Sequence, residues 1–314
     1  MPSQDNADDL REPPWALVTY HQGDPAKAEI GILAGEMVLR GPAEFAGLTM
    51  LDVLDAWDVF SPTLRTLAPG EFAPVEDAVL LAPLRYPRKV LCAGANYYAH
   101  LQEMGVERPS GAVDPYFFFK PPTTSVIGPD EPILLPTRPD RMIDWEVELA
   151  AVIGRRTTDV TPARAREHVA GWTVVNDVSA RDQLARTDPV APPFAHDWMR
   201  AKAGDASCPM GPGIVPDWLV DDPHRIALRL SVNGVVKQDS TTTDMVTGIW
   251  ELIAAASATV TLEPGDVIAT GTPAGVGYPH RDFLQPGDDV VAEIDGIGRL
   301  RNPVTETPMR GPAR

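Results

Sequence analysis

Apolar and polar residues alternate along two stretches near the start of the chain, residues 15–21 and 28–40. A period of two predicts strands that bury one face, and the intervening QGDPAK has the composition of a turn. The following stretch, residues 48–60, has helical spacing instead, with Thr49 in the position of an N-cap. The chain is therefore predicted to open with a pair of strands followed by a short helix.

Strand patterns outnumber helical ones over the rest of the chain. Asn233-Gly234 separates two β-compatible runs and predicts a type I′ hairpin, whereas residues 247–262 are predicted to form a helix of the core. No regular alternation of strands and helices is present, so we expect an α+β fold dominated by strands. It should contain a small N-terminal β-rich domain over residues 1–87, whose first 14 or so residues are mobile or loosely attached, and a larger domain over residues 88–314.

The amino-acid composition argues against nucleic acid and membranes as partners of this chain. The chain has 27 Lys and Arg against 44 Asp and Glu, a net charge of −17, which disfavours nucleic acid because phosphate binding needs a basic face. No stretch approaches the roughly 20 apolar residues of a membrane helix, and the acidic start does not resemble a secretory signal. Two cysteines, Cys92 and Cys208, are too few for a disulfide framework. We expect a cytoplasmic protein whose partner is a small molecule.

The strand predicted over residues 142–154, MIDWEVELAAVIG, carries two acids within an apolar run. Glu146 and Glu148 are two positions apart, so they share a face at a spacing of about 7 Å along the strand. Two buried carboxylates repel each other, and a cation such as Mg²⁺, Mn²⁺ or Ca²⁺ would remove the repulsion. The alternative is an edge strand whose acidic face is solvated.

A third oxygen ligand is available at the end of another predicted strand, in GWTVVNDVSARDQ. Asp177 ends that strand, where a side chain can point into a site. Mg²⁺ takes few protein ligands and keeps open positions for a substrate. Ser179 and Asp182 have the spacing of a capping box, so the alternative is that a helix begins here and Asp177 only caps it.

Acid–base chemistry is indicated by YYAHLQEM, a predicted short helix. His100 and Glu103 lie three residues apart and so on one helix face. A histidine oriented by a carboxylate is a common general base near neutral pH. The alternative is a solvated helix on which the two residues pair incidentally.

Several further residues are suited to bind an anionic substrate. Lys202 can neutralise an oxyanion, and Arg181 can hold a carboxylate with two hydrogen bonds. Gly271 and Thr272, in ATGTPAGVG, can present an N–H group and a hydroxyl. Each can equally be a surface residue or part of a structural turn. The same loop lacks the ending of a phosphate-binding P-loop, which excludes a nucleotide site of that type.

Taken in order, these stretches resemble the fumarylacetoacetate hydrolase family from about Lys89 to Val304. Eight segments carry the resemblance: GANYYAHLQE, FFFKPPTTSVIGP, DWEVELAAVIG, AGWTVVNDVSARD, KAGDASCPMGPGIV, LSVNGVVKQ, LEPGDVIATGTPAGVG and IDGIGRLRNPV. The resemblance implies a mixed β-roll with short flanking helices, usually as a homodimer. It also implies that Mg²⁺ or Mn²⁺ is held by Glu146, Glu148 and Asp177.

The resemblance further implies roles for residues outside the metal site. His100 and Glu103 would form a water-activating pair on a lid-like segment, and Lys202 matches the family's lysine near the substrate. The matching positions that line the pocket in relatives are Arg181, Gln183 and Thr272. The chain departs from the family after Lys202 and over residues 184–198, and both departures bear on the choice of substrate.

The activity implied is hydrolysis of a carbon–carbon bond in an acylpyruvate-like 2,4-dioxo acid, a small anionic 2-oxo acid, through a metal-stabilised enolate. Two alternatives share the enolate step without attack by water. They are decarboxylation of oxaloacetate-like diacids and isomerisation of unsaturated 2-oxo or 2-hydroxy diacids, as in aromatic catabolism. A fourth reading, from a different class, is a non-catalytic member that only binds metal or ligand.

Overall fold

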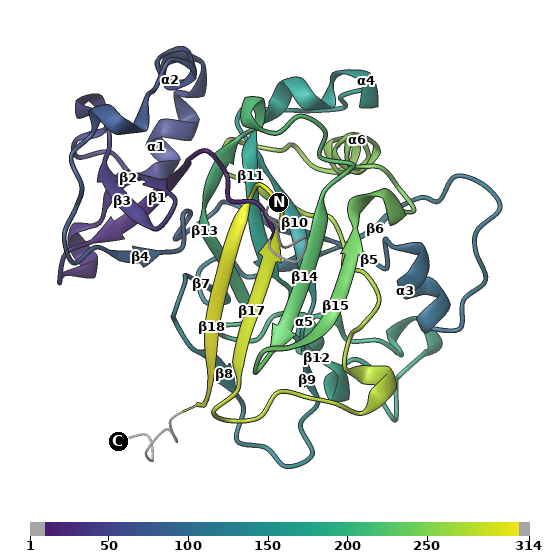
Figure 1. Ribbon diagram of the computed structural model, residues 1–314. Coiled ribbons are helices and arrows are strands. Elements are labelled where there is room, and N and C mark those ends of the chain that lie inside the picture. Colours follow the sequence, from purple (N-terminus) through teal and green to yellow (C-terminus); the bar gives the residue numbers. More distant parts are fainter. Residues whose placement is uncertain (1–9, 308–314) are drawn as a thin grey trace, which may run out of the picture.

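The structure is a computed structural model and describes residues 10–307 (Figure 1). Strands predominate and the helices are short, which confirms the predicted strand-dominated α+β class. Loose attachment is predicted for about the first 14 residues, of which residues 1–9 lie outside the described part of the chain. Among the others, Arg11 forms an ion pair with Asp295 at 2.7 Å, so that part of the prediction is wrong. The α-helices of the described part are α1 (Met50–Asp55), α2 (Trp57–Arg65), α3 (Tyr98–Glu103), α4 (Pro162–Ala165), α5 (Trp198–Lys202) and α6 (Ile249–Thr259).

The larger sheet has the order β3-β2-β1-β13-β11-β10-β16-β5-β6, with β4 beside β1 and β7 beside β13. Its strands are β1 (Ala16–His21), β2 (Glu29–Ala34), β3 (Met37–Arg40), β4 (Val79–Leu81), β5 (Val90–Gly94), β6 (Tyr116–Lys120), β7 (Val126–Ile127), β10 (Val147–Ile153), β11 (Val169–Asn176), β13 (Cys208–Pro216) and β16 (Val267–Ala269).

A second sheet has the order β15-β14-β17-β18-β8, and a short ladder joins β9 to β12. Asn233 and Gly234 connect β14 to β15 with positive φ angles of 53° and 75°, as a type I′ turn requires, so the predicted hairpin is confirmed. The strands are β8 (Ile133–Leu135), β14 (Ala227–Val232), β15 (Val235–Thr241), β17 (Asp289–Ile294), β18 (Gly298–Glu306), β9 (Ile143–Asp144) and β12 (Ser179–Ala180).

Strand β10 is a central strand, buried on both faces between β11 and β16. Alternate side chains therefore enter two different cores. Leu149 and Ala151 pack into the core beneath the second sheet. Ala150 and Val152 pack into a core shared with residues 15–84, which are called the N-terminal unit. Figure 1 shows β14 and β17 of the second sheet crossing in front of β10 and β11. The interpretation of this stretch as a solvated edge strand is wrong.

The first strands of the chain continue the larger sheet. Leu17 of β1 pairs with Ile214 of β13, so the N-terminal unit is joined to the rest by a strand ladder. Helix α1 is capped by Thr49, whose hydroxyl accepts from the Asp52 backbone while the Asp52 carboxylate accepts from the Thr49 backbone, a complete capping box. Trp57 of α2 packs into the same core as Leu17. The domain boundary near residue 87 stays a prediction.

The helices in the larger part are consistent with the sequence pattern. Helix α3 contains His100 and Glu103, and α6 covers the predicted core helix with Ile249 and Ile253 fully buried. Within residues 10–307, no helix combines the length and apolar character needed to cross a membrane.

Candidate active site

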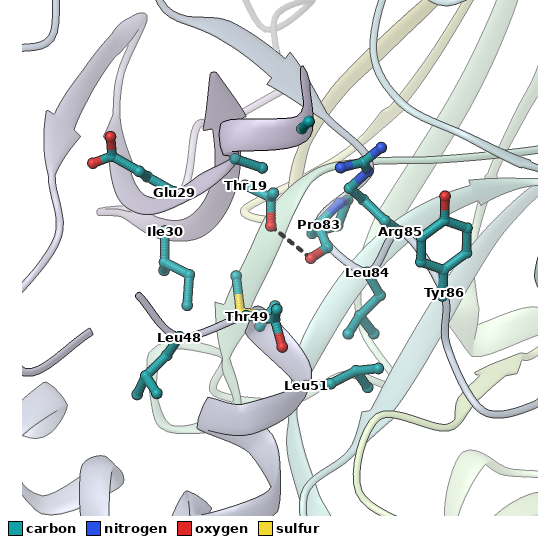
Figure 2. Close-up of a pocket in the computed structure, with 13 residues that line it drawn as sticks. Thr19, Glu29, Ile30, Leu48, Thr49, Leu51, Pro83, Leu84, Arg85 and Tyr86 are labelled. Carbon is teal, nitrogen blue, oxygen red and sulfur yellow. Dashed lines mark hydrogen bonds between the residues drawn. The ribbon is translucent and has the colours of Figure 1, made fainter. Parts of the chain in front are cut away.

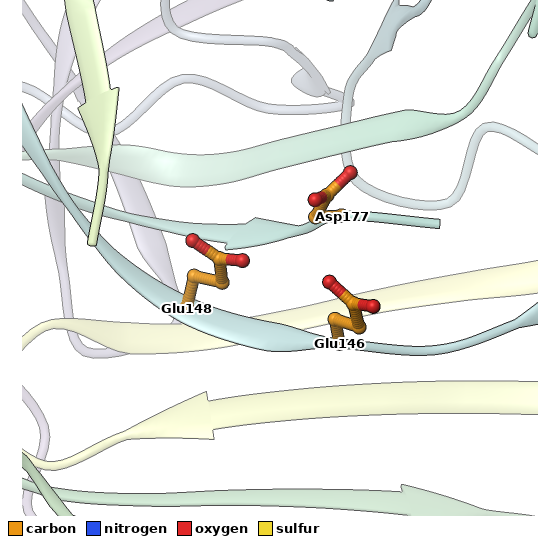
Figure 3. Close-up of side chains that lie close together, drawn as sticks. All are labelled: Glu146, Glu148 and Asp177. Atoms are coloured by element: carbon orange, nitrogen blue, oxygen red, sulfur yellow. The ribbon is translucent and has the colours of Figure 1, made fainter. Parts of the chain in front are cut away.

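Three buried carboxylates converge at the junction of β9, β10 and β11 (Figure 3). One oxygen from each of Glu146, Glu148 and Asp177 lies within 4.8 Å of the others. The strand register causes this convergence, because β10 and β11 are antiparallel with Val147 opposite Asn176. The Asp177 N–H donates to the Glu146 carbonyl at 2.8 Å, which brings the end of β11 beside the start of β10.

Two of the three carboxylates are paired with cations. The Lys202 ammonium lies 2.7 Å from both Glu146 Oε2 and Asp177 Oδ2. Burial alone would raise the pKa of Glu146. The charges of Lys202, Arg181 and His100 outweigh burial and hold that pKa well below its ordinary value.

Glu148 differs from its two neighbours. It accepts a hydrogen bond from the Gly271 N–H at 2.7 Å, and no ion pair to it is formed by the described Lys, Arg and His side chains. Burial raises the pKa of Glu148 well above its ordinary value, and the charges of Asp177 and Glu146 raise it further. A divalent cation shared by the three oxygens would relieve this repulsion, and hard oxygen donors suit Mg²⁺, Mn²⁺ or Ca²⁺. The residues present therefore fit such an ion.

A second buried lysine, which the sequence reasoning missed, supports the cluster. The Lys120 ammonium lies 2.8 Å from Asp177 Oδ1 and donates to the backbone carbonyls of Val178, Lys202 and Ser207. Its side chain is fully buried at the end of β6. The only signal in the sequence is a lysine that follows an aromatic run in FFFK, which does not reveal partners so far along the chain.

The predicted His–Glu pair forms and is enclosed. His100 Nδ1 lies 2.8 Å from Glu103 Oε2, and Glu103 Oε1 accepts from the Gly275 N–H at 2.9 Å. Burial alone would raise the pKa of Glu103, but the hydrogen bonds from His100 and Gly275 hold that pKa below its ordinary value. An ionised Glu103 keeps the proton of His100 on Nδ1 and leaves Nε2 as the basic atom. The interpretation as an incidental pair on a solvated helix is wrong, because His100 is buried.

Three of the four predicted substrate-binding residues lie against the carboxylates. Arg181 pairs with Glu146 at 2.6 Å, and Gly271 donates to Glu148. The Thr272 hydroxyl donates to the carbonyl of Val147, between the two acids. All three are held by protein groups, and their roles toward a substrate stay predictions.

Gln183 and its neighbours are arranged differently from the capping prediction. The Gln183 amide donates to Asp182, and its carbonyl oxygen accepts from Arg200. Ser179 lies in β12, where its hydroxyl donates to the Asp177 carbonyl, so it does not cap a helix. The prediction of a capping box at this point is wrong, because pairing of β12 with β9 extends the backbone through Ser179 and Ala180.

A separate pocket lies in the N-terminal unit, away from this site (Figure 2). It encloses about 210 Å³ between the β1–β2 region and the start of α1. The Thr19 hydroxyl on its wall donates to the Pro83 carbonyl at 2.8 Å, and Ile30, Leu48 and Leu84 line it with apolar groups. Its lining contains none of the residues of the carboxylate cluster.

Comparison with known proteins shows the family of the chain. The family described as "Fumarylacetoacetate (FAA) hydrolase C-terminal" matches residues 89–305. Oxaloacetate tautomerase fahd2, mitochondrial, from Xenopus laevis is 42% identical over 227 residues, which are 72% of this chain and 68% of the relative.

The fold is shared by solved structures, among them a hydrolase and an isomerase. The maleylpyruvate hydrolase from Sphingobium sp. SYK-6, in complex with manganese(II) ion and pyruvate, is 28% identical with a TM-score of 0.73 and covers 93% of this chain and 100% of that one. The 5-carboxymethyl-2-hydroxymuconate delta-isomerase from Mycobacterium smegmatis is 38% identical with a TM-score of 0.70 and covers 93% of this chain and 99% of that one. The chain belongs to the fumarylacetoacetate hydrolase family.

Proposed function

We propose that this chain is an enzyme that binds Mg²⁺ or Mn²⁺ and acts on a small anionic 2-oxo acid at C3, the carbon next to the oxo group. The observation that carries the proposal is that a buried cluster of three carboxylates and a buried His100–Glu103 pair occur together. One loop connects them, because Gly271 donates to Glu148 and Gly275 donates to Glu103. The ligands would be Glu146, Glu148 and Asp177. A bound divalent ion would supply Lewis-acid polarisation of the 2-oxo group, which acidifies C3.

The leading reaction is hydrolysis of an acylpyruvate-like 2,4-dioxo acid. Glu103 fixes the ring of His100, whose Nε2 takes a proton from water. The resulting hydroxide adds to the C4 carbonyl, and the C3–C4 bond then breaks with its electron pair going to C3. His100 returns the proton to C3, so the products are a carboxylic acid and pyruvate. Lys202 lies 2.7 Å from both Glu146 and Asp177 and is suited to stabilise the C4 oxyanion.

A second candidate is proton transfer or decarboxylation on oxaloacetate without attack by water. It is favoured by the 42% identity to a relative named oxaloacetate tautomerase. In the tautomerase version, His100 Nε2 moves a proton between C3 and the 2-oxo oxygen. The enclosed His–Glu pair can serve either reaction, because each includes the transfer of a proton to or from C3.

One experiment separates these reactions. The purified protein with Mg²⁺ or Mn²⁺ is given acetylpyruvate and, separately, oxaloacetate, and products are identified by NMR as acetate plus pyruvate, pyruvate plus CO₂, or a keto–enol exchange. We expect acetate plus pyruvate, abolished by H100Q and retained by H168Q. His168 is the matched control because it lies before β11 and bonds Thr157. Exchange or CO₂ release alone would replace the hydrolase proposal by the second candidate.

Absence of any turnover would support the interpretation that the chain is a non-catalytic member of the family that only binds metal or ligand. If a panel of 2-oxo acids is left unchanged by the wild-type protein while Mn²⁺ binds, the chain is a metal-binding member without catalysis. E146Q, which removes a metal ligand, is the negative control for every assay.

A further inference from the structure

Asp144 is a fully buried carboxylate that the mechanism above does not use. Its Oδ1 accepts from the backbone N–H groups of Trp145 at 2.8 Å and Gly277 at 2.7 Å. Its Oδ2 accepts from Arg181 Nε at 2.8 Å and from the N–H of Tyr278 at 3.1 Å. Both oxygens are thus engaged by donors, which an uncharged amide cannot match because one of its ends carries N–H groups.

One branch of this network leads to a predicted metal ligand. The guanidinium of Arg181 is held by Asp144 through Nε, and its NH2 lies 2.6 Å from Glu146 Oε1. The guanidinium of arginine is planar and rigid. A hydrogen bond that fixes its Nε edge therefore also fixes the direction in which its NH2 group points. Asp144 therefore sets the position from which Arg181 contacts Glu146.

The other branch leads to the acid–base pair. Asp144 anchors the loop at Gly277 and Tyr278, and Gly275 of the same loop donates its N–H to Glu103. Trp145 Nε1 donates to the Gly275 carbonyl at 3.0 Å, so β9 and the following residue hold the loop at two points.

The loop is closely packed at two of its glycines and leaves no room there for a side chain. A Cβ on Gly277 would lie 1.9 Å from the Asp282 carbonyl oxygen, and one on Gly275 would lie 2.0 Å from the Lys237 carbonyl oxygen. The hydrogen bonds of Asp144 to Gly277 and Tyr278, two and three residues beyond Gly275, link the position of Gly275 and its contact with Glu103 to Asp144.

We propose that Asp144 is a positioning residue that holds the carboxylate cluster and the His100–Glu103 pair in register with each other. Its effect on metal binding follows from the contacts alone. Its effect on turnover rests on the function proposed above. Groups that orient metal ligands through hydrogen bonds typically change affinity or activity by about 10–100-fold when replaced.

The test compares D144N with D266N. Asp266 is also a fully buried carboxylate, bonded to Lys89 and to the Glu263 N–H away from the carboxylate cluster, so D266N controls for the loss of a buried charge. Mn²⁺ affinity is measured by calorimetry, and kcat and KM are measured on whichever 2-oxo acid the wild type turns over. We expect D144N to bind Mn²⁺ about tenfold more weakly or worse and to lose about 10–100-fold in kcat with a smaller change in KM, while D266N stays near the wild type.

A double variant tests whether Asp144 acts through Glu103. If it does, then at saturating Mn²⁺, where the weaker metal binding of D144N is compensated, D144N/E103Q loses no more kcat than the worse single variant, whereas independent effects would multiply. If D144N does not fold, D144E keeps the charge, displaces the oxygens by one methylene and is judged by the same measurements.

The proposal is overturned if the D144 variant matches D266N in both Mn²⁺ affinity and turnover. Multiplied losses in the double variant at saturating Mn²⁺ would overturn the branch that runs through Gly275 to Glu103. It is also overturned if the wild type binds no Mn²⁺. A wild type that binds Mn²⁺ but turns over no 2-oxo acid contradicts the proposed function instead. The Mn²⁺ affinities of D144N and D266N then still decide the role of Asp144.

Discussion

The chemistry of this site depends on how a few charged side chains are buried together. The period of two along residues 142–154 correctly places Glu146 and Glu148 on one side of a strand. It cannot reveal the cations of the cluster, because only the fold brings Lys202 to Glu146 and Asp177 and Lys120 to Asp177. Local spacing predicts which acids share a face, and tertiary packing decides which charges oppose them.

Lys120 should be important for stability. Replacing it by Met keeps most of the side-chain volume but leaves Asp177 Oδ1 and three carbonyls without their donor. Removing one partner of a buried ion pair typically costs about 3–5 kcal/mol. We expect K120M to lower the free energy of unfolding by that order, measured by urea denaturation.

The matched control for this prediction is K237M. Lys237 pairs with Asp282 near the surface, and exposed pairs contribute about 0–1 kcal/mol. If K120M and K237M lose the same free energy of unfolding, the contacts of Lys120 with Asp177 and the three carbonyls do not stabilise the fold more than a surface ion pair does.

At the scale of elements, α3 is attached to the rest of the site through Glu103 and the loop around Gly275. The helix itself is predictable from YYAHLQEM, and so is the spacing of His100 and Glu103 on one face. The attachment is not predictable, because it joins segments 172 positions apart in the sequence. The incorrect capping prediction at Ser179 has a similar cause, since pairing with β9 outweighs the local helix signal.

The attachment has a consequence for stability at low pH. The pKa of Glu103 is lower in the folded protein than in the unfolded chain, where a glutamate titrates near 4.3. A lowered folded pKa stabilises the fold above the unfolded pKa, and this contribution is lost as the pH falls through the folded pKa. We expect the difference in unfolding free energy between wild type and E103Q to be full at pH 6 and to shrink below about pH 4.3.

Chemical denaturation across pH 3.5–6.5 measures this difference. E107Q is the control, because Glu107 is exposed and forms no ion pair among the described residues. A wild-type–E103Q difference that is constant over this range, as for E107Q, would contradict the ionised, hydrogen-bonded state of Glu103.

At the scale of the whole molecule, the N-terminal strands and the larger domain form one continuous sheet. The composition and turn signals around residue 87 suggest a boundary, but they carry no information on the pairing of Leu17 with Ile214. The two parts also share a hydrophobic core that includes Trp57 and Val152. Long-range strand pairing of this kind is the part of the fold that sequence periodicity does not predict.

A shared core predicts a single cooperative unfolding transition for both parts. Calorimetry should show one heat-absorption peak, and W57A should shift the whole peak to lower temperature, because it removes a large side chain from that core at a typical cost of about 3–5 kcal/mol. Two separable peaks, with only one moved by W57A, would show instead that the N-terminal unit is an independent domain.

The central claim is that Glu146, Glu148 and Asp177 together hold one divalent ion. The most direct measurement is anomalous diffraction at the manganese edge from crystals soaked in Mn²⁺, with D177N as the comparison. The account predicts one strong peak within coordination distance of an oxygen from each of the three side chains in the wild type, and its loss in D177N. A wild-type map without a peak between these carboxylates would contradict it.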